Sequence, residues 1–550
     1  MLLSSFVEKN TRYTEDESVK CRKPSEGGER MTTVSSHNAK VRTLYLSGLE
    51  GMVAEVEASI FPGLPSFEVV GLGDSSIREA KERVRASIRS CGYTFPNQRL
   101  LVNISPAYLH KSGSSFDLAI AMAILLASGQ VENRRGEIVI YGELSLTGEV
   151  RPVPGSVSRL LALEEQKDIT CIVPEKDIEE AQLLGVPVIG VETLVRAISV
   201  ISCGNIFPGM DSWDELIEEE FPEPSVDISS LRGQQEALRA ITLAAAGFHN
   251  LLLVGSPGTG KSLSARILQG ILPPLTRSEK IELLRVESAL SVLLKESIVS
   301  RERPFRYVHH TCTPSAMVGG GRNAVPGEIS RALNGILFLD ELPEFSPKVL
   351  DLLRVPIETG EMKVSRNNCT NLFPARFMLV AAMNPCRCGK WLESPSECTC
   401  SPSMISSYQG KVSGALLDRM DIYCTLNHIT EESLLETMKC DYTPESSIWR
   451  TRIEEIWEIQ YSRCREAGIT PVRNGECREG NLGDLFRLGK KEMEYAAMVA
   501  HQLHLSVRGL QRMVRLSRTI ADMDGDRDVK CDHIIEAVSF RLPQWGEKKI

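Results

Sequence analysis

The chain has 550 residues, which is too long for one hydrophobic core, so three or four folded units are expected. An apolar fraction of 42% and a charged fraction of 25% are those of an ordinary globular protein. The net charge of −9 argues against a generally basic nucleic-acid-binding chain, although it leaves room for a local basic channel.

The N-terminus carries no recognisable secretory leader, and the longest apolar run, residues 118–127, is too short to span a bilayer. We therefore expect a cytoplasmic protein without a membrane partner, in which most of the 15 cysteines stay reduced. Residues 1–40 contain few apolar positions and are expected to form a disordered tail.

Residues 41–200 alternate short strands and helices and are expected to form an α+β domain. Its predicted strands are 53–60, 100–104 and 137–141, and its predicted helices are 75–90 and 117–127. Residues 201–227 combine proline with Asp and Glu, which is typical of an acidic linker.

Residues 228–430 alternate helices with continuously apolar strands, a pattern that predicts an α/β domain with a parallel sheet covered on both faces. The predicted strands are 251–254, 336–339 and 377–382. Residues 431–550 show only helical spacing, at 448–466, 490–503 and 506–522, and are expected to form an all-helical lid.

A phosphate-binding loop of eight residues follows the first apolar strand of the second domain: Gly255, Ser256, Pro257, Gly258, Thr259, Gly260, Lys261 and Ser262. Glycines let backbone N–H groups face phosphates, and the helix that follows directs its positive end at them. Lys261 is then expected to reach the outer phosphates of ATP and Ser262 to ligate Mg²⁺. A tight turn without a ligand is the disfavoured alternative.

Two further strands end in polar residues. Asp340 and Glu341 close the strand 336–339, where Asp340 is expected in the Mg²⁺ shell and Glu341 beside the attacking water. Asn384 closes the strand 377–382 and is expected to orient that water, although an asparagine that opens a turn before Pro385 is an alternative.

Two arginines are assigned to the same chemistry. Arg419 is expected to act as a finger donated to the neighbouring subunit, and Arg508 as a lid sensor touching nucleotide of its own subunit. Ordinary surface salt bridges are the alternative for both.

Cys386, Cys388, Cys398 and Cys400 form a CxC–CxC cluster behind Asn384. Four thiolates suit tetrahedral zinc, and a structural metal is favoured over four free thiols although the spacing is tighter than usual. The adjacent His309 and His310 make a poor metal pair, and a structural or loop-contact role is expected for them.

Several strings together resemble one family, the Mg-chelatase-like AAA+ ATPases of the ComM/YifB type. They include PGLPSFEVVGL at 62–72, GSSFDLAIA at 113–121, GELSLTGEVRPV at 142–153, RPFRYVHHT at 303–311, GILFLDELPEF at 335–345, NPCRCG at 384–389 and SGALLDRMDI at 413–422. The resemblance implies an AAA+ P-loop domain between a Lon-protease-like α+β domain and a helical lid. It also implies a ring, expected to be a hexamer, that acts on single-stranded or branched DNA with recombination proteins during uptake of transforming DNA.

The resemblance has departures and leaves alternatives open. Tyr307, Val308, Arg387 and Ala415 replace residues that are usual in the family, but none is expected to contact phosphate. A protein-remodelling ATPase like the magnesium chelatase motor subunit is the alternative function. An ATP-dependent protease is disfavoured, because the Lon serine position falls near Ser115 but the lysine position falls near Val157.

Two loops are the expected DNA contacts: residues 318–322 with their glycine triplet, and a hairpin at 361–366 that carries Lys363 and Arg366. Basic residues on loops that line a ring can track phosphates without reading sequence. Ordinary solvated charges are an equally good interpretation of these residues.

Overall fold

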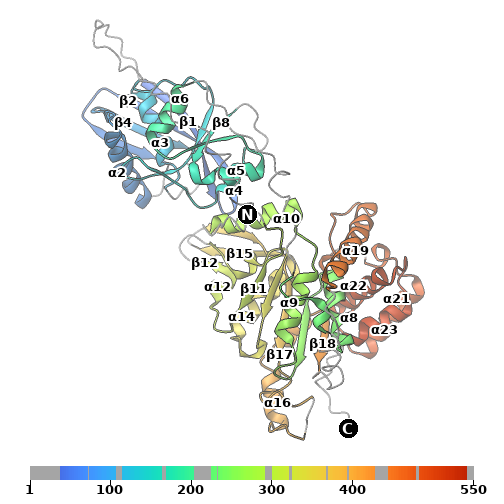
Figure 1. Cartoon of the computed structure of the whole chain (residues 1–550). Helices are drawn as coiled ribbons and strands as arrows, with labels where there is room; N and C mark the ends of the chain where they lie inside the picture. Colours follow the sequence, from blue (N-terminus) through green and yellow to red (C-terminus); the bar gives the residue numbers. More distant parts are fainter. Residues whose placement is uncertain are drawn as a thin grey trace.

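The computed structural model describes residues 37–71, 74–106, 114–163, 169–203, 224–231, 233–290, 300–320, 325–366, 369–392, 396–427, 444–478 and 482–541. An N-terminal unit, a central unit and a group of C-terminal helices follow one another along the chain (Figure 1). Most of the expected tail and linker lies outside these residues, although strand β1 begins at His37, within the last four positions of the expected tail. None of the described helices is long and apolar enough to cross a membrane.

The N-terminal unit is a mixed sheet covered by helices. Among the described residues the strand order is β3-β4-β2-β1-β5-β8-β9. These strands are β1 (His37–Ser47), β2 (Glu50–Phe61), β3 (Ser66–Val70), β4 (Arg99–Ser105), β5 (Ile138–Ile140), β8 (Thr170–Pro174) and β9 (Val188–Val191). The helices are α2 (Asp74–Ser90), α3 (Asp117–Ala127), α4 (Ser156–Leu161), α5 (Ile178–Leu184) and α6 (Leu194–Ser202). Helix α3 is apolar on all sides and correspondingly buried at the centre of this unit.

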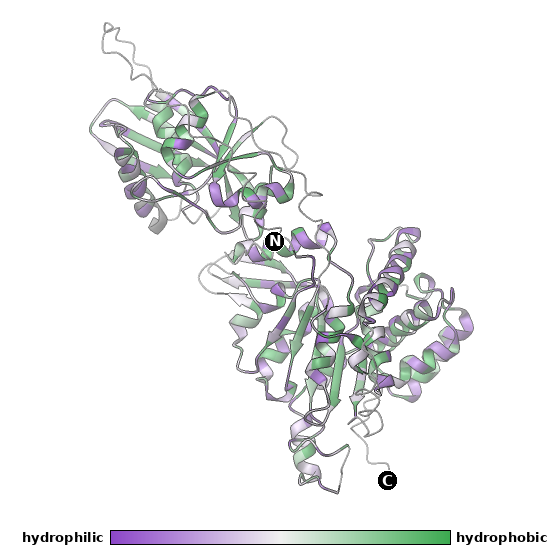
Figure 2. Cartoon of the chain, viewed as in Figure 1, coloured by the Kyte–Doolittle hydropathy of each residue, from purple (hydrophilic) through white to green (hydrophobic). Residues whose placement is uncertain are grey.

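The central unit confirms the predicted parallel sheet. Five described strands pair in parallel in the order β11-β14-β17-β10-β18. They are β10 (Leu251–Gly255), β11 (Phe305–Val308), β14 (Ile336–Leu339), β17 (Met378–Met383) and β18 (Ile422–Leu426). Every residue of β10, β14 and β17 is buried, as expected for a sheet covered on both faces, and Figure 2 shows these strands as hydrophobic.

Helices and small hairpins surround this sheet. The helices include α8 (Gln235–Gly247), α9 (Lys261–Ile271), α10 (Arg277–Ala289), α14 (Pro347–Leu352), α15 (Arg354–Thr359) and α16 (Pro402–Gln409). One insertion holds α12 (Pro314–Val318) and the short strands β12 (Gly319–Gly320) and β13 (Val325–Pro326). A second is the hairpin of β15 (Glu361–Arg366) and β16 (Cys369–Pro374), at the predicted position.

The described residues after β18 form helices, as predicted. The longer ones are α19 (Ser446–Glu466), α21 (Lys490–Gln502), α22 (Val507–Asp524) and α23 (Cys531–Ser539). Their outer faces are hydrophilic (Figure 2). Their inner faces share a hydrophobic core with α8 and α9, where the Trp457 indole N–H donates to the Ala245 carbonyl at 3.1 Å.

Helix α10 joins the first two units. Leu284 is fully buried in a core built mainly by the N-terminal unit, whereas Leu283 and Val286 are buried in the core of the central unit. The contact is reinforced by polar groups, because the Gly155 N–H donates to the Ser288 carbonyl at 2.9 Å. The Arg285 guanidinium likewise donates to the Leu49 carbonyl at 2.9 Å. One helix therefore serves two hydrophobic cores.

Candidate active site

The phosphate-binding loop connects β10 with α9. Gly258 and Gly260 adopt φ values of 85° and 88°, in the left-handed region that side chains disfavour. A Cβ at either position would meet nothing within 4 Å, so the loop leaves open space on the side of these two glycines. Helix α9 begins at Lys261, which places its positive N-terminal end at the loop. This cradle suits a phosphate group.

Side chains that follow three neighbouring strands meet at the carboxyl edge of the sheet. The Lys261 ammonium donates to the carbonyls of Gly255 and Ser256 at 2.7 and 2.8 Å and to the Asn384 side-chain oxygen at 3.0 Å. The Ser262 hydroxyl donates to the Asp340 carboxylate at 3.0 Å. They meet because β14, β17 and β10 run in parallel and all end at this edge. The hydroxyl and carboxylate are oxygen donors of the kind that Mg²⁺ prefers.

Glu341 lies next to Asp340 in an unusual conformation. Its φ of 53° lies in the left-handed region, and its backbone N–H donates to the Asp340 carboxylate at 2.9 Å. Its own side chain is 58% exposed, so solvent water can reach its carboxylate. Burial, followed by the charges of Asp340 and Glu341, raises the pKa of Tyr307 above its ordinary value.

His310 lies at this site, although only a structural or loop-contact role was predicted for it. Its Nδ1 lies 3.5 Å from the Glu341 carboxylate. The ring of His309 stacks on it, with ring centroids 4.1 Å apart. His310 and Glu341 meet because β11 pairs with β14 and both strands end shortly before them. No local sequence pattern encodes that pairing.

Arg419 and Arg508 come together at a single carboxylate, that of Glu358 in α15. The Arg419 guanidinium lies 2.8 Å from it and Arg508 lies 3.2 Å from it. Arg419 is only 8% exposed and also donates to the Arg354 carbonyl at 3.1 Å, whereas Arg508 is 59% exposed. The observed ion pairs fit the salt-bridge interpretation, and the finger and lid-sensor roles stay predictions.

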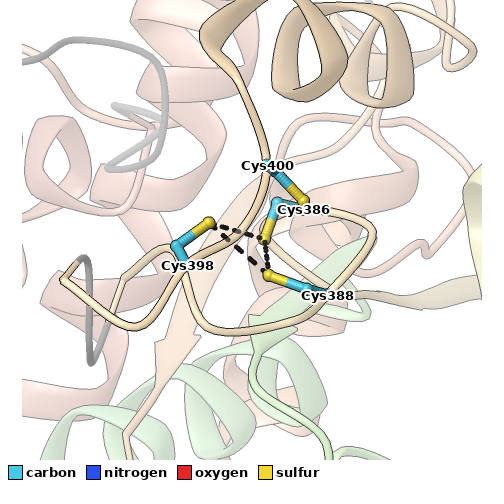
Figure 3. A group of neighbouring side chains, drawn as sticks. All are labelled: Cys386, Cys388, Cys398 and Cys400. Carbon is cyan, nitrogen blue, oxygen red and sulfur yellow. Dashed lines mark hydrogen bonds between the residues drawn. The ribbon is translucent and has the colours of Figure 1, made fainter.

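The four cysteines gather inside one loop between β17 and α16 (Figure 3). Cys386 Sγ lies 3.4 Å from Cys388 Sγ and 3.8 Å from Cys398 Sγ, and the last two sulfurs are 3.5 Å apart. All four, Cys400 included, lie within 4.8 Å of one another. A tetrahedron of thiolates at a Zn–S distance of about 2.3 Å has edges of about 3.8 Å. The arrangement therefore fits a zinc ion.

Ser115 and Val157 are the positions expected to correspond to the serine and the lysine of a Lon active site. The Ser115 hydroxyl is buried and has no hydrogen-bond partner among the described residues. Val157 is fully buried on α4 within a hydrophobic core. Neither observation supplies a base for the serine.

The expected DNA-contact hairpin alternates in the manner of a half-buried strand. Met362 and Val364 are buried in the central core, while Lys363 points to solvent. The side chain of Arg366 and the residue Arg322 lie outside the described part of the chain. The side chain of Asn371, on the other strand, lies beside Gly48 of the N-terminal unit, where an added Cβ would meet its oxygen at 3.3 Å.

Comparison with known proteins places these features in a family. Three family models match: "Magnesium chelatase, subunit ChlI" at 227–434, "Subunit ChlI of Mg-chelatase" at 56–177 and "Magnesium chelatase, subunit ChlI C-terminal" at 443–541. "Competence protein ComM" of Haemophilus influenzae is 37% identical over 500 residues, covering 90% of this chain and 95% of that protein. "Uncharacterized protein YifB" of Escherichia coli is 36% identical over 510 residues, covering 91% and 96%. The "Magnesium-chelatase 38 kDa subunit" of Cereibacter sphaeroides is 30% identical over 173 residues, covering 28% and 52%.

Proposed function

Because the chain belongs to the Mg-chelatase-like AAA+ ATPases of the ComM/YifB family, we propose that it is a cytoplasmic ring motor that spends ATP to move along DNA. The observation that supports ATP hydrolysis most directly is the group of Lys261, Ser262, Asp340 and Asn384 at one sheet edge. The motor is proposed to work as a hexamer in branch migration of transforming DNA.

The residues of the sheet edge divide the chemistry among themselves. When bound, ATP would supply the phosphoryl group, and Mg²⁺ would neutralise negative charge on the phosphate oxygens. The backbone amides of the loop and the ammonium of Lys261 would hold the phosphates, while Ser262 and Asp340 would be the ligands for the metal. Glu341 accepts a proton from the attacking water, and the Asn384 amide orients that water. Arg419 and Arg508 are proposed to stabilise phosphate charge once subunits assemble.

The cysteine cluster is proposed to hold one structural zinc ion. Cys386, Cys388, Cys398 and Cys400 would be the ligands, and the metal would supply a fixed tetrahedral crosslink to a loop. Four thiols that stay free are the competing interpretation. Elemental analysis of the purified chain decides between them, because a zinc site requires close to one zinc per chain.

The DNA part of the proposal rests on the family and on the exposed Lys363. One relative that matches nearly the whole chain is called a competence protein, which fits a role in handling incoming DNA together with recombination proteins. The direct test measures the ATPase rate with and without single-stranded and forked DNA, and then the resolution of a three-way junction. Strong stimulation and ATP-dependent strand displacement are expected. An ATPase indifferent to every DNA would contradict this part.

The hairpin can be tested separately from the motor. Lys363→Ala/Arg366→Ala is expected to weaken DNA binding and to lower the slope of log affinity against log salt by about one per lost phosphate contact. The matched control is Lys490→Ala/Lys491→Ala, which removes the same charge from the exposed helix α21. Unchanged affinity and slope in the hairpin variant would remove the hairpin from the DNA path.

A second candidate is a protein-remodelling ATPase, which the three chelatase-subunit matches favour. It uses the same nucleotide chemistry on a protein partner, so DNA would leave its ATPase rate unchanged. The relative named as a chelatase subunit matches only 28% of the chain, and this candidate is therefore placed second.

A further inference from the structure

The cysteine loop lies directly against the phosphate-binding loop. The buried Ser256 hydroxyl donates to the Gly389 carbonyl at 2.7 Å. A Cβ built on Gly389 would lie 2.4 Å from Pro257 Cδ, so the proline ring packs against Gly389 in space that a side chain there would occupy. Gly389 adopts a φ of 84° and donates its N–H to the Cys386 carbonyl at 3.1 Å. One residue of the cysteine loop therefore supports two consecutive residues of the phosphate-binding loop.

The cysteines position that support. Among the described residues between β17 and α16 there is no helix or strand, so regular backbone pairing does not fix the shape of this loop. Gly389 follows Cys388 immediately and is linked to Cys386 by its own hydrogen bond. Gln409 donates to the Pro385 carbonyl at 2.9 Å, which holds the start of the loop. The Lys390 ammonium pairs with the Glu397 carboxylate at 2.8 Å across the loop. The four sulfurs, within 4.8 Å of one another, bring the two ends of the loop together beside Gly389 (Figure 3).

We propose that zinc on the four cysteines braces the phosphate-binding loop, so that metal occupancy controls nucleotide affinity. The inference rests on the proposed ATP and zinc sites and adds a coupling between them. With zinc bound, Gly389 is held where it supports Ser256 and Pro257. Without zinc, the cysteine loop relaxes and the hydrogen bond from Ser256 to Gly389 is lost. The backbone N–H groups of the phosphate-binding loop are then less well preorganised for phosphate. Loss of one hydrogen bond of ordinary strength corresponds to an affinity change of about fivefold to tenfold.

The test uses the full chain and fluorescent mant-ADP in the presence of Mg²⁺. Zinc is removed with a zinc-selective chelator under reducing conditions, the chelator is removed by desalting, and zinc content is measured before each titration. The zinc-free chain is expected to bind mant-ADP about fivefold to tenfold more weakly, and added ZnCl₂ is expected to restore the original Kd. Equal Kd values with and without zinc would overturn the brace, as would a chain that retains no zinc after reconstitution.

A variant separates the brace from the metal itself. Gly389→Ala leaves all four cysteines in place but adds a methyl group against Pro257. It is expected to keep its zinc and to bind mant-ADP several-fold more weakly. The control is Gly468→Ala, which strains a similar backbone (φ 70°) but meets nothing within 4 Å. A zinc-loaded Gly389→Ala chain with the parent Kd would contradict the proposed contact.

These outcomes are distinguishable from failure of the proposed function. A zinc-loaded parent chain that binds no mant-ADP would overturn the ATP site, and the brace with it. A parent chain that binds mant-ADP equally well with and without zinc would leave the ATPase intact and remove only the brace.

Discussion

Two serines, one in the central unit and one in the N-terminal unit, differ in their exposure and in their hydrogen-bond partners. Ser262 lies at the end of a parallel sheet, and its hydroxyl pairs with Asp340 at 3.0 Å in an exposed, polar setting. Ser115 lies in the N-terminal unit, where its hydroxyl is buried and has no hydrogen-bond partner among the described residues. A hydroxyl becomes reactive, or binds metal, only when neighbouring groups hold and polarise it. The difference fits the proposal that the nucleotide chemistry lies in the central unit.

The same contrast extends to the carboxylates. Glu341 is exposed beside an imidazole, whereas Glu180 of α5 is buried and one of its oxygens has no hydrogen-bond partner in the described structure. Burial and the charge of Asp177 raise the pKa of Glu180 to about 8. Glu341 is thus accessible to water, whereas burial of the Glu180 carboxylate costs stability when that group is ionised.

The largest effect is expected from replacing the Glu341 carboxylate. Glu341→Gln should lower the ATPase kcat by about 10²- to 10⁴-fold, because the amide cannot accept a proton from water. Nucleotide binding should persist, since Glu341 is not assigned to the phosphates. Phosphate-release kinetics and mant-ATP titration measure the two quantities. Glu344→Gln, an exposed neighbour paired with Lys411, is the control. A Glu341→Gln chain as fast as the parent would break the comparison.

His310→Ala should have a smaller effect on the same reaction. As a positioning residue 3.5 Å from Glu341, it should lower kcat by about tenfold while leaving nucleotide affinity unchanged. His309→Ala is the matched control, because its ring stacks on His310 and its Nδ1 pairs with the Thr311 hydroxyl. Equal losses in both variants, or a loss confined to KM, would contradict a positioning role.

Glu180→Gln should change stability and not catalysis. The folded pKa lies above the ordinary 4.5, so the fold favours the protonated form and stability falls as pH rises from about 4.5 through 8. The neutral amide should therefore raise Tm by about 2–4 °C at pH 8.5 and by less at pH 5.5. Calorimetry at both pH values measures this, with Glu179→Gln on the exposed side of α5 as control. A pH-independent difference would be evidence against the buried-carboxyl explanation.

Ser115→Ala should have the smallest effect. Removing a buried hydroxyl without a partner should leave Tm unchanged or slightly higher, and neither parent nor variant should degrade casein. Ser262→Ala, the counterpart in the other unit, should lose most ATPase activity. Casein degradation that survives Lys261→Ala and disappears with Ser115→Ala would contradict this prediction, because it would identify Ser115 as a peptidase nucleophile.

The parts of the fold that depend on short-range pattern were predictable. Helix α3 and strand β14 were predicted at their observed bounds, because a continuous run of apolar residues between polar ones determines them. The P-loop residues and Asp340 could be assigned because each follows an apolar strand. Strand β1 was missed: its first four residues were placed in the expected polar tail, and residues 41–47 were not identified as a strand.

The parts that depend on long-range pairing were not predictable. Strand order decides that His310 meets Glu341, and no local pattern encodes it. Arg419 and Arg508 share Glu358 only because the lid helix α22 returns to the central unit. The contact of Gly389 with Pro257 likewise joins loops more than a hundred positions apart. Such contacts follow from tertiary packing and leave no periodic trace in the sequence.

Helix α10 has a practical consequence for dissecting the protein. Leu284 is buried in a core of the N-terminal unit, whereas Leu283 and Val286 are buried in the core of the central unit. Separating the two units would therefore expose apolar surface on both of them. A fragment that ends near residue 203 would present an uncovered leucine-sized hollow, and a fragment that starts near 228 would present a bare leucine. Both truncations should be prone to aggregate, and cooperative melting should appear as one transition in the intact chain.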